Sequence, residues 1–227
     1  MKKYIFLTIL FLIQSLGFSQ SRVNSFDNNN QRHGFWTKYY KDTEVIRFSG
    51  EFNHGSEIGI FKFYDESGSL VAEKVYKANS NICHAKLYNS RHNIVAEGDF
   101  KGKKKNGLWK YFSADKYLLM TETYVNGKLE GEKITYYKNG EITEKSKYKL
   151  DKLNGISVRF SDTGIQISKQ IYKNGALDGA VEYCNAESGD VLIKGQYKKG
   201  KRVGKWNFFS EGKVVRTKDY DKNKSHK

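Results

Sequence analysis

Apolar residues recur along this chain at a constant spacing of 24 residues, and this period limits the possible folds more than any other feature. One series is aliphatic, two are aromatic and the fourth is glycine. The four series are Ile46, Leu70, Ile94, Leu118 and Ile142; Phe52, Tyr76, Phe100, Tyr124, Tyr148 and Tyr172; Tyr64, Tyr88, Phe112, Tyr136 and Phe160; and Gly59, Gly107, Gly131, Gly155 and Gly179. A shared period of this length predicts about eight similar units, from residue 33 to 220, each packed against the next.

Within a unit, the pattern alternates with a period of two residues. Residues 107–112 and 117–124 read as two strands, separated by a turn at 113–116. Asn-Gly pairs punctuate the units, and Asn79, His92 and Asp151 take positions where other units have glycine; these types tolerate a positive φ better than most. The chain has no proline and no stretch of helical periodicity. We therefore predict an all-β fold, an elongated single-layer antiparallel meander of about eight β-hairpin repeats.

Three segments, residues 50–61, 98–109 and 195–206, resemble the membrane occupation and recognition nexus (MORN) repeat. The unit length and the tyrosine that ends each unit are similar to those of the bacterial MORN-variant proteins, many of which are labelled antitoxin-like. The resemblance implies a MORN-like solenoid of hairpins. For function it implies an alternative to a general scaffold, namely an antitoxin or immunity-type protein whose face neutralises a toxin partner.

The first residues have the pattern of a signal peptide, which we predict to end at residue 19. Lys2 and Lys3 precede an apolar run, and Gly17 and Ser19 supply small residues before the cut. We expect an exported chain, periplasmic, cell-surface or secreted, with no transmembrane segment after cleavage. A polar linker at 20–32 and a basic tail at 221–227 flank the repeats. Cys83 and Cys184 lie four units apart, roughly 40 Å along such a sheet, so we expect free thiols.

Four aromatic residues lie outside the regular series and are the candidate binding surface: Trp36, Phe61, Trp109 and Trp206. Counting alternation along each strand, we expect them to point away from the aromatic series described above. The middle units have Lys133 and Ser157 at this position, so the surface would be interrupted by a polar stretch. The pattern leaves open a groove for a partner or a face that packs on itself.

The formal net charge is +15. The segment from Lys194 to Lys227 contains twelve lysines and arginines but only three acidic residues. We expect the basic end and the turn before Trp109 to contribute candidate binding residues: Lys103, Lys104, Lys105, Lys199, Lys201 and Arg202. Export argues against nucleic acid and favours anionic lipid headgroups, an acidic polysaccharide or a protein partner. The alternative is a basic end that only solubilises and protects an edge strand.

The chain lacks the motifs of the common hydrolase and phosphate-binding sites. Cys83, His84 and His92 are the only grouping that suggests a metal site or an unrecognised hydrolase, and their spacing matches no metal motif. We therefore predict no enzyme activity, no metal and no cofactor. The leading hypothesis is an exported, non-catalytic scaffold that binds a protein partner or an anionic envelope surface.

Overall fold

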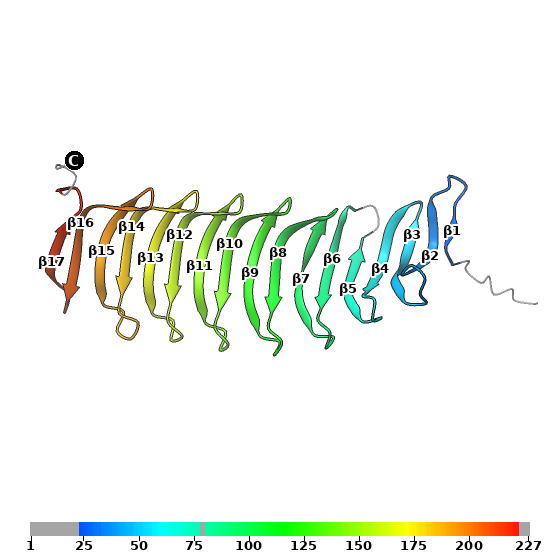
Figure 1. Cartoon of the computed structure of the whole chain (residues 1–227), viewed down its shortest axis with the longest axis horizontal. Coiled ribbons are helices and arrows are strands. Elements are labelled where there is room, and N and C mark those ends of the chain that lie inside the picture. The colour runs from blue at the N-terminus through cyan, green and yellow to red at the C-terminus, as the bar shows by residue number, and fades with distance from the viewer. Residues whose placement is uncertain (1–22, 78–79, 223–227) are drawn as a thin grey trace, which may run out of the picture.

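The computed structural model describes residues 23–77 and 80–222 and confirms the predicted fold class (Figure 1). Each strand pairs antiparallel with the next along the chain, giving one open, single-layer meander sheet. The strands are β1 (Ser25–Phe26), β2 (Arg32–Tyr39), β3 (Ile46–Asn53), β4 (Ser56–Tyr64), β5 (Leu70–Tyr76), β6 (Ile82–Tyr88), β7 (Ile94–Lys101), β8 (Lys104–Phe112), β9 (Leu118–Val125), β10 (Lys128–Tyr136), β11 (Ile142–Lys149), β12 (Lys152–Phe160), β13 (Gln166–Lys173), β14 (Ala176–Cys184), β15 (Val191–Lys198), β16 (Lys201–Ser210) and β17 (Lys213–Asp219). At about 4.8 Å between strands, the slab is roughly 75 to 80 Å long.

From β6 to β16, turns of two lengths alternate and mark the two long rims of the slab. Two-residue turns such as Asn126-Gly127 and Asn174-Gly175 lie on the upper rim in Figure 1, and longer turns lie on the lower rim. Both residues of these two turns have positive φ, which the twist of a tight hairpin requires. His92 and Asp151 also have positive φ, as predicted, with values of 58° and 66°. Asn79 lies outside the described residues.

The packing that stabilises this open sheet lies on one side, which we call the aromatic face. It is defined by Phe52, Phe61, Phe100, Trp109, Tyr197 and Trp206. Trp109 lies flat over Gly98 of the neighbouring strand, where an added Cβ would come 2.6 Å from the indole ring. Gly50 lies under Phe61 and Gly195 under Trp206 in the same way, with added Cβ atoms 2.4 and 2.2 Å from those rings. Each of these three rings therefore needs a glycine beneath it.

The residue type eleven positions earlier in the sequence depends on whether the large ring is present. It is glycine before Phe61, Trp109 and Trp206, and a side chain where the ring is absent. The pairs without a ring are Lys74 with Ala85, Glu122 with Lys133, Ser146 with Ser157, and Gln170 with Val181, each directly opposite across two strands. Along the face, a large ring is thus paired with a glycine, and where the ring is absent two side chains lie opposite each other.

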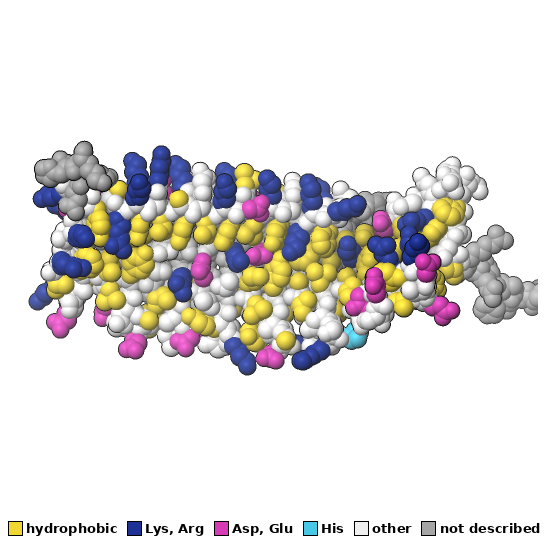
Figure 2. Space-filling view, viewed as in Figure 1, with side chains coloured by type: hydrophobic (Ala, Val, Ile, Leu, Met, Phe, Trp, Pro, Cys, Tyr) yellow, Lys and Arg dark blue, Asp and Glu magenta, His cyan; other side chains and the backbone are white. Residues whose placement is uncertain are grey.

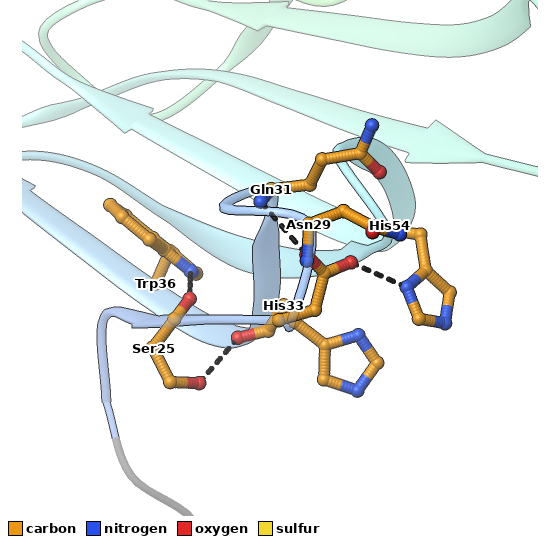
Figure 3. A network of polar contacts seen from close by, with 7 residues as sticks. Ser25, Asn29, Gln31, His33, Trp36 and His54 are labelled. Atoms are coloured by element: carbon orange, nitrogen blue, oxygen red, sulfur yellow. Dashed lines mark hydrogen bonds and ion pairs between the residues drawn. The ribbon is translucent and has the colours of Figure 1, made fainter.

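The N-terminal end of the sheet is closed by β1 and the turn that follows it (Figure 3). The Trp36 indole donates a hydrogen bond to the Ser25 carbonyl over 3.0 Å, and Phe26 packs edge-to-face on the Trp36 ring. Asp27 accepts hydrogen bonds from the backbone of Asn29 and Gln31 and pairs with His54 at 2.6 Å. The segment expected to be a polar linker thus contains a short strand that covers the β2 edge, although the sheet edge at β17 has no such cover within the described residues.

The predicted signal peptide at 1–19 lies outside the described residues. Within the described part of the chain, no helix is long and apolar enough to cross a bilayer. Cys83 and Cys184 are both free thiols, as expected, and Cys83 is buried on the aromatic face beside Phe100.

Candidate interaction surfaces

The irregular aromatic residues proposed as a binding surface form the core of the sheet. Phe61, Trp109 and Trp206 are 2%, 0% and 1% exposed, and Trp36 is partly buried. The expectation that they point away from the series of Phe52 and Phe100 is wrong. Phe61 contacts Phe52 edge-to-face at 5.1 Å between centroids, and Trp109 contacts Phe100 at 4.9 Å.

The reason for this error is strand register, which alternation along a single strand does not reveal. The two-residue turn after Lys101 pairs Phe100 with Lys105, so Phe100 shares a face with Lys105 and Trp109. The other aromatic series, which includes Tyr88 and Phe112, lies on the opposite face. The two regular series therefore occupy different faces, and only one of them packs with the tryptophans.

A cation four residues before each tryptophan lies over the indole ring. Arg32 lies 5.0 Å from the Trp36 centroid, Lys105 4.6 Å from Trp109, and Arg202 4.5 Å from Trp206. Lys105 also donates a hydrogen bond to the Tyr111 hydroxyl, and Arg202 to the Tyr220 hydroxyl. Lys105 and Arg202, expected as binding residues, therefore make cation–π contacts that stabilise the face.

In the middle of the aromatic face a polar network replaces the stacked rings. Glu122 pairs with Lys133 at 3.0 Å and accepts a hydrogen bond from Tyr124 at 2.6 Å. Burial acts to raise the pKa of Glu122, but hydrogen bonds from Tyr124 and Lys133 outweigh burial and lower it. Burial also lowers the pKa of Lys105 and raises that of Tyr111. The polar interruption expected at Lys133 is present, and its charges are paired.

The next pair along the face, Ser146 with Ser157, continues this polar stretch with hydroxyl groups. The Ser146 and Ser157 side chains lie 2.9 Å apart between their oxygens, and both donate to the Glu144 carboxylate. Both serines are buried, and every buried side-chain nitrogen or oxygen among the described residues has a partner. The stretch is therefore a satisfied packing arrangement.

The second surface is a row of lysines that we call the basic rim, formed by the two-residue turns from β7 to β16. Figure 2 shows lysine and arginine side chains gathered along this upper rim, above a band of hydrophobic side chains. It contains the carboxylates of Asp151 and of Glu130, which accepts a hydrogen bond from the Leu150 backbone, and ten exposed lysines: Lys101, Lys103, Lys104, Lys128, Lys149, Lys152, Lys173, Lys198, Lys199 and Lys201. None of these lysines has a carboxylate within 4.0 Å among the described residues. The five turns span roughly 40 Å.

The opposite rim carries the opposite charge. Its turns hold four lysines or arginines and ten carboxylates, namely Asp42, Glu44, Asp65, Glu66, Asp115, Glu141, Asp162, Glu187, Asp190 and Glu211. Two ion pairs, Lys41 with Asp42 and Lys138 with Asp115, reach 4.0 Å there. Across its width the slab therefore has one strongly basic rim and one acidic rim.

The structure places four of the six expected basic residues, Lys103, Lys104, Lys199 and Lys201, on the basic rim. From the sequence, these residues were expected in two separate patches, and the lysines in the three turns between them were not among the expected binding residues. The signal was present in the sequence, because Lys101, Lys149 and Lys173 share the 24-residue period of the aromatic series. The basic surface therefore runs along the slab instead of occupying one end.

Cys83, His84 and His92, the residues suggested as a metal site, do not lie together in the structure. His84 lies on the face opposite to Cys83 and pairs with Asp99 at 2.8 Å, while His92 is in a turn of the acidic rim. Among residues 23–77 and 80–222, no group of three or more histidine, cysteine or acidic side chains is placed to hold a metal ion. Burial raises the pKa of the Cys83 thiol, which makes it a poor nucleophile.

Comparisons with known proteins do not assign the chain to a family. No protein-family model matches the chain, and no curated protein matches it. One solved structure with similarity is a complex of a mutant Staphylococcus aureus TarM with fondaparinux, alpha-GlcNAc-glycerol and UDP. The match covers 63% of this chain and 21% of that chain, with 9% sequence identity and a TM-score of 0.27. A likeness this low carries no argument about function.

Proposed function

We propose that this chain is an exported, non-catalytic β-repeat scaffold that attaches to an anionic envelope surface through its basic rim. The observation that carries the proposal is the row of ten exposed lysines without carboxylate partners within 4.0 Å in the described part of the chain. Export rests on the signal-peptide pattern of the sequence. A non-catalytic role is supported by the buried charged groups: Glu122 and Lys133, for example, form an ion pair within the packed aromatic face.

Two apolar side chains among the lysines favour lipid headgroups as the anionic surface. Val125, at the end of β9, and Leu150, in the turn after β11, are 48% and 56% exposed on the basic rim. Leu150 has a positive φ of 49°, a conformation that a leucine adopts at a steric cost. Exposed apolar residues flanked by lysines are typical of segments that rest in the interface of an anionic membrane.

The test is sedimentation of the mature chain with vesicles of anionic or neutral lipid. A rim variant carries one lysine-to-glutamine substitution in each of five turns: Lys103, Lys128, Lys152, Lys173 and Lys199. Each lysine near an anionic membrane contributes about 1 kcal/mol, so we expect binding at low salt to fall at least 100-fold. Binding by the unchanged chain should weaken as salt rises.

A control variant separates position from net charge. It replaces five exposed lysines away from the basic rim, Lys41, Lys62, Lys138, Lys169 and Lys205, by glutamine, with the same change in net charge. The control should keep most of the binding. Equal loss in both variants would refute a role for the rim. A salt-independent, stoichiometric protein partner captured by the aromatic or opposite face would instead favour the immunity-type alternative.

Val125→Ser with Leu150→Asn distinguishes the two anionic surfaces. This variant should weaken binding to anionic vesicles and leave binding to a soluble acidic polysaccharide unchanged, because only the membrane takes up apolar side chains. Binding to anionic vesicles that these substitutions leave unchanged would contradict a membrane surface and favour the polysaccharide.

A further inference from the structure

A hollow of about 360 Å³ lies at the acidic rim, between the turn from β6 to β7 and the turn from β8 to β9. Its lining combines three apolar side chains, Tyr88, Ile94 and Phe112, with four polar ones, His92, Asn93, Glu97 and Lys116. Because Glu97 lies next to Gly98 on the sheet and pairs with Lys110, the hollow is on the face opposite to Trp109. It is separate from the basic rim.

Two of the lining residues adopt a backbone conformation that the other units give to glycine. His92 and Lys116 have φ values of 58° and 69°, and the matching residues in other turns are Gly68, Gly140 and Gly164. The turns are equivalent, since each of these residues donates a backbone hydrogen bond to the carbonyl three residues earlier. Side chains at positive φ are strained, and such strain tends to persist at functional positions. Both strained residues border the same hollow.

The polar groups around the hollow are available to a ligand. The side chains of His92, Asn93 and Lys116 make no hydrogen bond or ion pair with any described residue. Glu97 is 3.3 Å from Lys110, so its charge is already balanced. The free groups are therefore an amide, an imidazole and an ammonium, a set that suits hydroxyl groups and one carboxylate.

The apolar lining suits a sugar ring better than a flat base. Tyr88 ends β6 and Phe112 ends β8, so their strands are roughly 9.6 Å apart. These apolar rings lie beside side chains that can donate hydrogen bonds, and this combination favours a ring that carries hydroxyl groups. A puckered sugar ring is thicker and has apolar C–H groups that pack on aromatic side chains. We propose that this hollow binds one acidic sugar residue of the hexuronate type, with its carboxylate at His92 and Lys116.

The test is titration of the isotope-labelled chain with glucuronate, followed by the amide resonances of residues 88–94 and 112–117. We expect saturable shifts with a dissociation constant on the order of 1 mM, a weak affinity typical of a single small ligand. Glucose lacks the carboxylate and acetate lacks the ring, so each should bind at least tenfold more weakly. Equal shifts with acetate, shifts confined to the basic rim, or an absence of shifts with glucuronate would overturn the proposal.

A pair of substitutions tests whether the strained residues hold the ligand. His92→Gly with Lys116→Gly gives both turns the residue used elsewhere in the chain, so the thermal midpoint should not fall. Binding of glucuronate should decrease at least tenfold. The matched control, Asn126→Gly with Asn174→Gly, makes the same kind of change at positive-φ positions outside the hollow and should leave binding unchanged. Binding of glucuronate by the first variant as tight as that by the unchanged chain would also overturn the proposal.

Discussion

Gly98→Ala tests the packing that stabilises the sheet. A Cβ at residue 98 would lie 2.6 Å from the Trp109 ring, closer than real contacts allow, so the indole must move. The ring is fully buried and its nitrogen donates to the Asp99 carbonyl over 2.9 Å, which leaves it little freedom to shift. Overpacking of this kind costs about 1–3 kcal/mol. We expect this loss in the local free energy of unfolding of β7 and β8.

If the ring packs on the glycine, substitutions at residues 98 and 109 must be energetically coupled, and a double-mutant cycle measures this coupling. Trp109→Ala alone should cost about 3–5 kcal/mol. With the ring removed, Gly98→Ala should be neutral or slightly stabilising, because alanine restricts the unfolded chain more than glycine does. Amide hydrogen exchange in β7 and β8 is the suitable assay, since a long repeat need not unfold in one step.

A second glycine provides the control for backbone effects. Gly107 has a φ of 76° and nothing within 4 Å of an added Cβ. Gly107→Ala should therefore cost about 1–2 kcal/mol from its backbone conformation, with or without the Trp109 ring. If Gly98→Ala costs the same in both backgrounds, the proposed contact between glycine and ring is refuted.

Two further predictions concern titratable groups. Because the pKa of Glu122 is lowered in the folded chain, its stabilising effect is present above pH 4.5 and lost as the pH falls through the folded value. Glu122→Gln should therefore destabilise the sheet at pH 7, and the difference from the unchanged chain should shrink in acid unfolding curves; a constant difference would contradict this. For the thiols, Cys83 is 3% exposed and Cys184 is partly exposed. A thiol reagent should therefore modify Cys184 first and reach Cys83 only on unfolding, as peptide mapping can show.

The repeated pattern in the sequence was sufficient to predict the architecture. A 24-residue period, alternation within units and glycine turns determine hairpins that pair with their neighbours, because each interaction links residues close in sequence. The large distance between Cys83 and Cys184 follows from the number of repeat units between them. The polar interruption at Lys133 and Ser157 was also visible in the sequence.

The sequence also held a signal that alternation alone does not reveal. Glycine stands eleven residues before Phe61, Trp109 and Trp206, and other residues stand there where the ring is missing. This pairing of glycine with ring indicates that the rings pack on the backbone and are buried, so they do not form a surface open to a partner.

Only the tertiary structure decided which residues share a face and which share a rim. Register across a turn sets the face, so a shift of one residue would move Phe100 away from Trp109. The chain changes rim at the end of every strand, so charges that are neighbours in the sequence separate onto opposite rims. Lysines about 24 residues apart, such as Lys149 and Lys173, instead come to lie in successive turns on one rim. Counting charges along the sequence therefore combines residues from both rims. The row of lysines on one rim can be identified only once the pairing of the strands is known.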